Sequence, residues 1–278
     1  MALSLSHGKQ LDVGHHGIAQ DDLPPMERGA LDPRHWFKPD DNPAQPNTPG
    51  DDSPGVNSPG DNTPGTPPAS PRPIELEIGS GKGTFLVQHA QLYPDVDFLG
   101  IEWAKSFWRY AADRARRRGF DNIRLLRCDA DMFIRHYVPD AVFRQVHIYF
   151  PDPWPKKRHH KRRLIQADFL RELHRVLVHA EANPVPSAPC SAGGPSAHPT
   201  GQVGGQTTAS PRIRIATDHA DYFDWMREHA ATVEDLFDRL PFQSPESAGE
   251  GEMVGTNFER KYRKEGRPFH GMILRKRP

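Results

Sequence analysis

The sequence is poor in cysteine, in long apolar runs and in net charge. Its 278 residues include only two cysteines, Cys128 and Cys190, which argues against a disulfide framework and favours a reducing cytosol. No apolar stretch approaches the length of a membrane span, and the N-terminus lacks the apolar core of a signal peptide. These absences predict a soluble cytoplasmic protein with one large domain or two small ones.

The charge balance conceals an uneven distribution. Lysines and arginines number 36, as do aspartates and glutamates, and this balance alone argues against a nucleic-acid partner. Residues 1–73, however, hold ten acidic against five basic side chains, which leaves residues 74–278 with 31 basic against 26 acidic ones. Local clustering of cations matters more for phosphate binding than net charge does. The clusters lie at 114–118, 156–163, 260–267 and 275–277.

Two segments are too poor in large apolar side chains to form a core. Residues 42–73 repeat Pro-Gly pairs among Ser, Thr, Asn and Asp, and residues 181–211 consist largely of Pro, Ala, Gly and Ser. Because neither segment can bury enough surface to offset chain entropy, we predict that both are disordered. We therefore predict a partly ordered N-terminal segment at 1–41, followed by a linker at 42–73. One domain follows at 74–278, with an insertion at 181–211.

The apolar pattern of the remaining sequence alternates between the periods of strand and helix. We predict strands at 74–78, 97–101, 123–127, 146–150, 212–216 and 271–274. We predict helices at 84–92, 104–118, 130–137, 164–179 and 219–232. Such alternation indicates the α/β class, with a doubly wound, mainly parallel, Rossmann-like sheet covered by helices on both faces.

A glycine-rich turn, Gly79-Ser80-Gly81-Lys82-Gly83, joins the first of these strands to a helix. Glycines at this place let backbone N–H groups approach a ligand closely, so we expect Gly79 and Gly81 to contact one. A P-loop is disfavoured because Leu76 stands where its first glycine belongs, and a dinucleotide fingerprint fails at its last glycine. S-adenosylmethionine fits better, because its cationic amino-acid end would be attracted to the carboxylate of Glu77.

Acidic residues occur in phase at the ends of the first four main strands. Glu102 closes the second, where an acid can accept from both ribose hydroxyls, and Asp129 follows the third, placed for the adenine edge. Asp152 follows the fourth. Open α/β sheets bind ligands at the carboxyl ends of their strands, so we expect these three residues and Glu77 to line one crevice. Each one taken singly could equally be a helix cap or a solvated loop carboxylate.

The most informative stretch begins where the strand at 146–150 ends. The two prolines of Pro151-Asp152-Pro153-Trp154 stiffen the loop that bears the Asp152 carboxylate and the Trp154 ring. Six permanent cations and two histidines follow within residues 156–163. This combination suits a protein that holds one base while gripping a polyanionic backbone. The alternatives are a solvated helix start for the cations and simple packing on the sheet edge for Trp154.

At this point the chain resembles the bacterial tRNA (guanine-N7-)-methyltransferases, class I enzymes that depend on S-adenosylmethionine. The matching strings occur in the right order: Leu76–Gly83, Phe98–Glu102, Phe150–Trp154 with the Arg158–Arg163 tract, Ala216–Asp218 and Thr256–Tyr262. The resemblance implies S-adenosylmethionine as the cofactor and tRNA as the partner. It also implies methyl transfer to N7 of a guanine, the variable-loop guanine at position 46 of the tRNA.

The resemblance further implies roles for individual residues. It assigns the contacts with S-adenosylmethionine, or the shaping of its pocket, to Glu77, Glu102, Asp129 and Asp152. It assigns substrate binding to Lys156, Asp218, Thr256, Asn257, Phe258 and Glu259. It assigns RNA contact to Arg158, His159, His160, Lys161, Arg162 and Arg163. Glu259 could accept from the guanine amino group, while the alternative for Thr256–Glu259 is a cap that begins a basic helix.

Guanine N7 has an in-plane lone pair at neutral pH, so methylation there requires no base. The work left to the protein is positioning of the two reactants. We therefore predict that Asp152 is the catalytic residue, which orients the base and offsets the positive charge that grows on the purine. No metal is predicted, because His159 and His160 lack a Cys or an acid at ligand spacing. The predicted oligomeric state is a monomer or a homodimer.

Two other functions remain open at this level. An exocyclic-amine methyltransferase acting on RNA or DNA would use an Asp/Asn-Pro-Pro-aromatic loop, which Asp152-Pro153-Trp154 only approximates. A non-catalytic RNA-binding module with a degenerate cofactor pocket is the other alternative. The intact acids at the strand ends argue against it.

Overall fold

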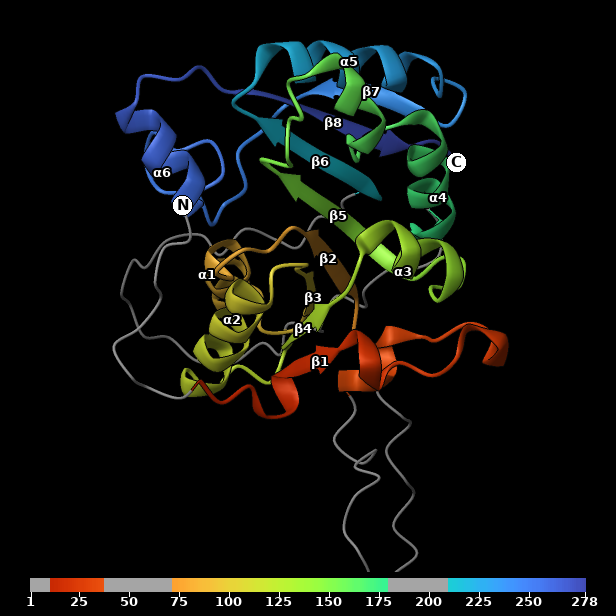
Figure 1. Ribbon diagram of the computed structural model, residues 1–278, viewed down its shortest axis with the longest axis vertical. Helices are drawn as coiled ribbons and strands as arrows, with labels where there is room; N and C mark the ends of the chain where they lie inside the picture. Colours follow the sequence, from red (N-terminus) through yellow and green to blue (C-terminus); the bar gives the residue numbers. More distant parts are fainter. Residues whose placement is uncertain (1–10, 38–71, 180–209) are drawn as a thin grey trace, which may run out of the picture.

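The computed structural model describes residues 11–37, 72–179 and 210–278, which form a mixed sheet covered by helices on both faces (Figure 1). Its strands are β1 Gly17–Ala19, β2 Ile74–Ile78, β3 Asp97–Ile101, β4 Ile123–Arg127, β5 Phe143–Tyr149, β6 Arg212–Thr217, β7 Phe237–Pro241 and β8 His270–Lys276. Its α-helices are α1 Thr84–Leu92, α2 Lys105–Arg117, α3 Ala130–His136, α4 Ala167–Val176, α5 Ala220–Ala231 and α6 Asn257–Lys264.

The strands lie in the order β1-β4-β3-β2-β5-β6-β8-β7. All neighbouring pairs from β1 to β6 are parallel, and β8 runs antiparallel to both β6 and β7. The predicted α/β class with a mainly parallel sheet is thereby confirmed. Because β2 lies at the centre, the turns that follow β2, β3, β4 and β5 meet at one edge of the sheet.

The two faces of β2 differ in chemistry. Successive side chains of a strand point to opposite faces. Ile74, Leu76 and Ile78 enter the large apolar core that also contains side chains of α3, α4 and α5, such as Phe133 and Phe169. The alternate residues, Glu75 and Glu77, are also buried. A central strand with two buried carboxylates is costly unless they have partners, so their surroundings matter for function.

A second core, built from Leu86, Val87, Phe98, Trp108 and Ala111 among others, joins α1 and α2 to β3 and β4. Figure 1 shows these two helices on one side of the sheet and α3 and α4 on the other. Burial of the apolar side chains in these two cores is the main source of stability for such a fold. The arrangement leaves the carboxyl ends of the central strands open.

The helix predicted at 164–179 is shorter in the structure, because residues near both of its ends form hydrogen bonds with other elements. At the start, the backbone N–H of Ile165 donates to the hydroxyl of Tyr222 at 3.2 Å. At the end, Leu177 has extended backbone and bridges to Phe143 of β5. The helix therefore spans Ala167–Val176 only.

Strands β1 and β7 were not among the predicted elements, and the helix α6 was present only as the alternative for Thr256–Glu259, a cap that begins a basic helix. β1 pairs with β4 and forms the edge of the sheet, and neighbouring residues of the N-terminal segment also dock, since the carbonyl of Trp36 accepts from Arg124 at 2.9 Å. β7 is an edge strand that ends in Pro241, a residue that edges tolerate. The predicted disorder of 42–73 and 181–211 lies almost entirely outside the described residues.

Two smaller findings concern the thiol and the membrane. Cys128 is a buried free thiol, and burial raises its pKa to about 11. Cys190 lies outside the described residues. Within the described ranges, no helix combines the length and the apolar character that crossing a bilayer requires.

Candidate active site

A cavity of about 420 Å³ lies at the carboxyl ends of β2, β3, β4 and β5. Five predicted cofactor-binding residues line it: Gly79, Gly81, Glu102, Asp129 and Asp152. Its wall also includes apolar and aromatic side chains: Ile78, Ile101, Trp103, Phe107, Tyr149, Phe150, Trp154, Leu164 and Phe258. The structure thus brings together the residues that the sequence places at four separate strand ends. A concave wall with few polar groups is typical of a small-molecule site.

Glu77, the sixth predicted cofactor residue, precedes the lining residue Ile78 and is 3% exposed. Its Oε2 atom has no hydrogen-bond partner within the part of the chain that the structure describes. Burial, and next the nearby charge of Glu102, raise the pKa of Glu77 well above its usual value. A buried acid without a partner is compensated when a cation binds beside it. The residue therefore fits the cationic amino-acid end of S-adenosylmethionine.

Glu102 ties the first two turns together. Its two carboxylate oxygens accept from the backbone N–H groups of Gly81 and Ala104, each at 2.8 Å. Gly79 and Gly81 have φ values of 79° and 53°, in the left-handed region that glycine adopts at little cost. Each oxygen keeps a second lone pair, so the carboxylate can still accept from ribose hydroxyls. Burial raises the pKa of Glu102.

Asp129 and Asp152 follow β4 and β5, the two strands that flank the β3–β2 pair. Asp129 caps α3, since its side chain accepts from the backbone N–H of Met132 at 2.9 Å. This is the helix cap that the sequence left as the alternative, and it is compatible with a place in the cavity wall. Asp152 is exposed, and its charge is close enough to contribute to the raised pKa of Glu102.

The loop that bears Asp152 is held in an unusual backbone conformation. Phe150 and Trp154, on either side of Asp152, have φ values of 55° and 43°, which are rare for non-glycine residues. The Trp154 ring lies under the guanidinium of Arg162, at 5.0 Å, and edge-on to His159, at 5.7 Å. Local strain of this kind persists only where surrounding contacts enforce it, and it concentrates at functional sites.

The basic tract forms a short 3-10 helix, Lys157–Arg162, beside the cavity. Four of its cations and the residue before it are exposed and form no salt bridge with described residues: Lys156, Lys157, Arg158, Lys161 and Arg162. His159 and His160 are half-buried. An exposed group of unpaired cations next to the cavity is what phosphate contact requires.

Arg163 departs from the prediction for the tract, because its side chain is buried, at 1% exposed, and RNA contact requires an exposed cation. Its Nε donates to the carbonyl of Pro153 at 2.9 Å, and its guanidinium pairs with Asp221 of α5. The guanidinium also lies over the rings of Tyr222, at 5.0 Å, and Trp225, at 5.3 Å. Arg163 therefore anchors the Asp152 loop to α5 instead of offering a phosphate contact.

The predicted substrate segment is divided between the cavity and the protein interior. Phe258 lines the cavity and is 41% exposed, whereas Asn257 donates to the hydroxyl of Thr84 at 2.9 Å. Thr256 caps α6 by accepting from the backbone N–H of Glu259 at 3.1 Å. Among the four residues of the segment, Phe258 alone lines the cavity.

The carboxylate of Glu259 is fully buried and occupied. It accepts from the backbone N–H groups of Met253, Val254 and Gly255 and pairs with Arg263 at 2.6 Å. Burial alone would raise the pKa of Glu259, but these bonds outweigh it and lower the pKa. The structure therefore places it as a loop anchor and does not turn it toward a base.

The other two predicted substrate residues, Asp218 and Lys156, lie outside the cavity lining. Asp218 accepts from Arg267 at 2.7 Å, and Lys156 is exposed at the start of the 3-10 helix. Both remain predictions as substrate contacts.

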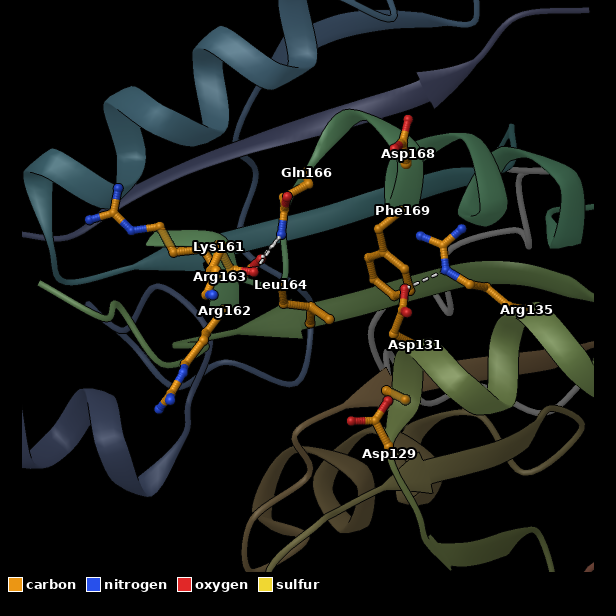
Figure 2. A pocket seen from close by; sticks show the side chains of 11 residues that line it. Asp129, Asp131, Arg135, Lys161, Arg162, Arg163, Leu164, Gln166, Asp168 and Phe169 are labelled. Carbon is orange, nitrogen blue, oxygen red and sulfur yellow. Dashed lines mark hydrogen bonds and ion pairs between the residues drawn. The ribbon is translucent and has the colours of Figure 1, made fainter. Parts of the chain in front are cut away.

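A second cavity of about 290 Å³ adjoins the first and shares Asp129, Ala130, Arg162 and Leu164 with it. Figure 2 shows Asp131 and Arg135 of α3 on one side, joined by an ion pair, and the start of α4 on the other. The cavity continues the polar surface from the basic tract toward α3.

The geometry agrees with comparisons to known proteins. A family model described as "Putative methyltransferase" matches residues 71–181. The tRNA (guanine-N(7)-)-methyltransferase of Halorhodospira halophila is 34% identical over 213 residues, which are 76% of this chain and 77% of that protein. The chain belongs to the tRNA (guanine-N7-)-methyltransferase family.

Other members of this family are comparably similar. The protein of the same name from Rhodopirellula baltica is 31% identical over 89% of this chain and 77% of its own.

Among solved structures, a 30S ribosomal A1408 methyltransferase from an uncultured bacterium has a TM-score of 0.44 at 9% identity. That match covers 74% of this chain and 88% of the other.

The structure also shows the environment of residues that the sequence did not single out. Trp103, Phe107, Tyr149 and Leu164 line the cavity, yet the sequence places the last three only within predicted helices or a strand and gives none of the four a role. Arg163 resembles the other cations of its tract, and its different environment depends on α5, some 58 residues away along the chain.

Arg163 provides a test of loop anchoring in this family member. Replacing Arg163 with lysine keeps the charge but removes the guanidinium fork that joins Pro153 to Asp221. We expect kcat to fall at least about tenfold while donor affinity stays nearly constant, because small misplacements of reacting groups are costly. Arg158→Lys, at an exposed position, is the matched control. Equal behaviour of the two variants in steady-state kinetics would contradict the anchoring role.

Proposed function

We propose that this protein transfers the methyl group of S-adenosylmethionine to N7 of a guanine in tRNA, and that the guanine is the variable-loop residue at position 46. The observation that supports this best is the cavity itself. Its wall has the exposed carboxylate of Asp152 beside cations that no described residue pairs, and Glu77, whose buried Oε2 has no partner among the described residues, directly precedes the lining residue Ile78. Relatives that carry the name tRNA (guanine-N(7)-)-methyltransferase share this chain over most of its length.

The residues divide the work by place. Glu77 would hold the ammonium end of the donor, Gly79 and Gly81 would give the backbone room to approach it, and Glu102 would accept from the ribose. When bound, S-adenosylmethionine supplies a methyl group that is already activated by the positive sulfur. The lone pair of guanine N7 forms the new bond and the old bonding pair stays with sulfur, so the protein needs to supply no base.

Asp152 would stand where charge changes during this transfer. The purine becomes cationic as N7 is methylated, and a nearby carboxylate stabilises that charge. The raised pKa of Glu102 reflects, after burial, the negative charge of Asp152 next to it. Trp154, whose ring contacts Arg162 and His159, would form one wall of the site for the base. The strained loop and Arg163 would keep the carboxylate in position.

A labelled-methyl assay tests the proposal. Unmodified tRNA transcript and S-adenosylmethionine with a tritiated methyl group are incubated with the protein, and the RNA is digested to nucleosides. We expect label in 7-methylguanosine, and none in a transcript whose variable-loop guanine is changed to adenine. Label in a base methylated on an exocyclic amine would instead favour the alternative methyltransferase. Label in 7-methylguanosine from both transcripts would contradict the position.

The exposed cations of the tract provide a separate test of tRNA binding. Replacing Lys157, Arg158 and Lys161 together with glutamine removes charges that the described residues leave unpaired. We expect weaker tRNA binding and a shallower dependence on salt, by about one unit of log–log slope for each phosphate that is no longer neutralised. Affinity for the donor should not change. Replacement of the exposed Arg239 of β7 with glutamine serves as control, and an unchanged slope in the triple variant would exclude the tract as the phosphate contact.

A further inference from the structure

Behind the cavity, polar side chains of β2, β5 and α1 are packed together out of contact with solvent. Glu75, His147, Tyr149 and His89 are 0%, 1%, 5% and 6% exposed. None of the four has a part in the function described so far, although Tyr149 lines the cavity. Buried polar groups in proteins are almost always hydrogen-bonded, and an extended group of them is maintained for a reason.

The hydrogen bonds of this group form a chain that ends at the cavity wall. Oε1 of Glu75 accepts from Nε of Arg144 at 3.0 Å and from Nε2 of Gln145 at 3.1 Å. Oε2 of Glu75 lies 2.9 Å from Nε2 of His147. Nδ1 of His147 lies 2.8 Å from the hydroxyl oxygen of Tyr149. The chain therefore runs from the start of β2 to the last residue of β5.

The chemistry of the chain fixes where its protons reside. Burial lowers the pKa of His147 to about 4, so this imidazole is neutral. Burial alone would raise the pKa of Glu75, but its hydrogen bond with His147 and the imidazole of His89, 3.6 Å away, outweigh it and lower the pKa, so this carboxylate is charged. A neutral imidazole donates through one nitrogen and accepts through the other. Since Glu75 can only accept, Nε2 of His147 donates to it, and Nδ1 must accept the hydroxyl proton of Tyr149.

We propose that Tyr149 binds the methyl donor: its phenolic oxygen, whose proton is held by His147, accepts a hydrogen bond from the donor's ammonium group beside Glu77. Glu75 and His147 are positioning residues that act through Tyr149. Glu77 of β2 is paired with His147 of β5 in the sheet, so Tyr149, two residues further along β5, points to the same face of the sheet as Glu77. The inference rests on the proposed function for the identity of the donor.

The same group also has the composition of a metal site, since ligand atoms of Glu75, His89 and His147 lie within 4.8 Å of one another. The surrounding charges favour the hydrogen-bonded form. Glu75 is already paired with Arg144. Burial lowers the pKa of His147, and the nearby positive charge of Arg214 lowers it further. A divalent cation would add positive charge next to two half-buried arginines.

Binding of two product-like ligands to the Tyr149→Phe variant tests the proposal. S-adenosylhomocysteine has the ammonium group, whereas 5′-methylthioadenosine lacks the whole amino-acid end. We expect the Kd of the first to rise about tenfold or more, as when a hydrogen bond to a charged group is removed, and the Kd of the second to stay within about twofold. Equal weakening of both ligands, or of neither, would overturn the proposal.

Tyr137→Phe is the matched control, because Tyr137 is 7% exposed and its hydroxyl donates to the carbonyl of Pro24 at 3.0 Å, outside the cavity. His147→Phe should weaken S-adenosylhomocysteine selectively, and its combination with Tyr149→Phe should add nothing, since both act through one oxygen. One zinc per chain in the purified protein, absent from His89→Gln, would also overturn the hydrogen-bonded assignment. These binding results do not depend on tRNA, so a failure of methyl transfer can be told apart from a failure of this inference.

Discussion

Replacing Asp152 with asparagine is expected to lower kcat about a hundredfold or more, while the Kd of the methyl donor stays within about threefold. Asparagine has the same shape but no charge, so the variant isolates the electrostatic contribution to a transition state in which the purine becomes cationic. Removing one preorganised electrostatic group from an active site typically has an effect of this size. The position of Asp152 at the cavity, exposed and next to Glu102, supports the assignment.

The measurement is single-turnover methylation of tRNA transcript at saturating donor, together with a direct titration of S-adenosylhomocysteine. Asp131→Asn is the matched control, since Asp131 lies on α3 outside the main cavity and pairs with Arg135 at 2.8 Å. If Asp152→Asn lowers kcat and donor affinity by the same factor, Asp152 is a binding residue and has no special role in the transition state.

Replacing Glu77 with glutamine is expected to weaken donor binding by about 2–5 kcal/mol, roughly thirtyfold or more, which is the usual cost of deleting one partner of a buried charge pair. The free protein should lose no stability and should gain about 1 kcal/mol at neutral pH. The reason is that the wild-type carboxylate is 3% exposed and its Oε2 has no partner in the described part of the chain. Calorimetric titration and thermal unfolding measure the two effects.

The sign of the pH dependence follows from the raised pKa of Glu77. The folded, ligand-free protein holds the proton more tightly than the unfolded chain does. The carboxyl therefore destabilises the fold least at low pH, and stability falls as pH rises above the usual range of a glutamate. Donor binding needs the charged form and should strengthen over the same pH interval. Glu77→Gln should remove both dependences; persistence of the binding dependence in this variant would assign it to another group.

The positions of Glu77, Glu102, Asp129 and Asp152 were predictable because they depend on a regular property of parallel sheets. Strand residues can be recognised from local apolar patterns, and the carboxyl ends of parallel strands always meet at one edge. The same logic gave the class of the fold and the bounds of β2, β3, β4 and α1. The cap at Asp129 was open in the sequence only as an alternative, and the backbone contacts of Glu102 were not predictable, since they depend on the exact turn.

The environments of Arg163 and Glu259 could not be predicted, because each depends on packing between segments far apart in the chain or on a loop without a pattern. In the sequence, Arg163 is one of six similar cations, and only α5 distinguishes it by supplying Asp221 and two aromatic rings. Glu259 is withdrawn from the cavity by the irregular backbone of 253–255. The buried series of hydrogen bonds from Glu75 to Tyr149 could not be predicted from the sequence for the same reason.

Nucleoside analysis of tRNA after incubation with S-adenosylmethionine bearing a labelled methyl group tests the central claim most directly. Wild-type protein should place the label in 7-methylguanosine of an unmodified transcript, with Asp152→Asn slower and Glu77→Gln restored by excess donor. Label found in any other nucleoside, or no transfer by a protein that binds both donor and tRNA, would contradict the account.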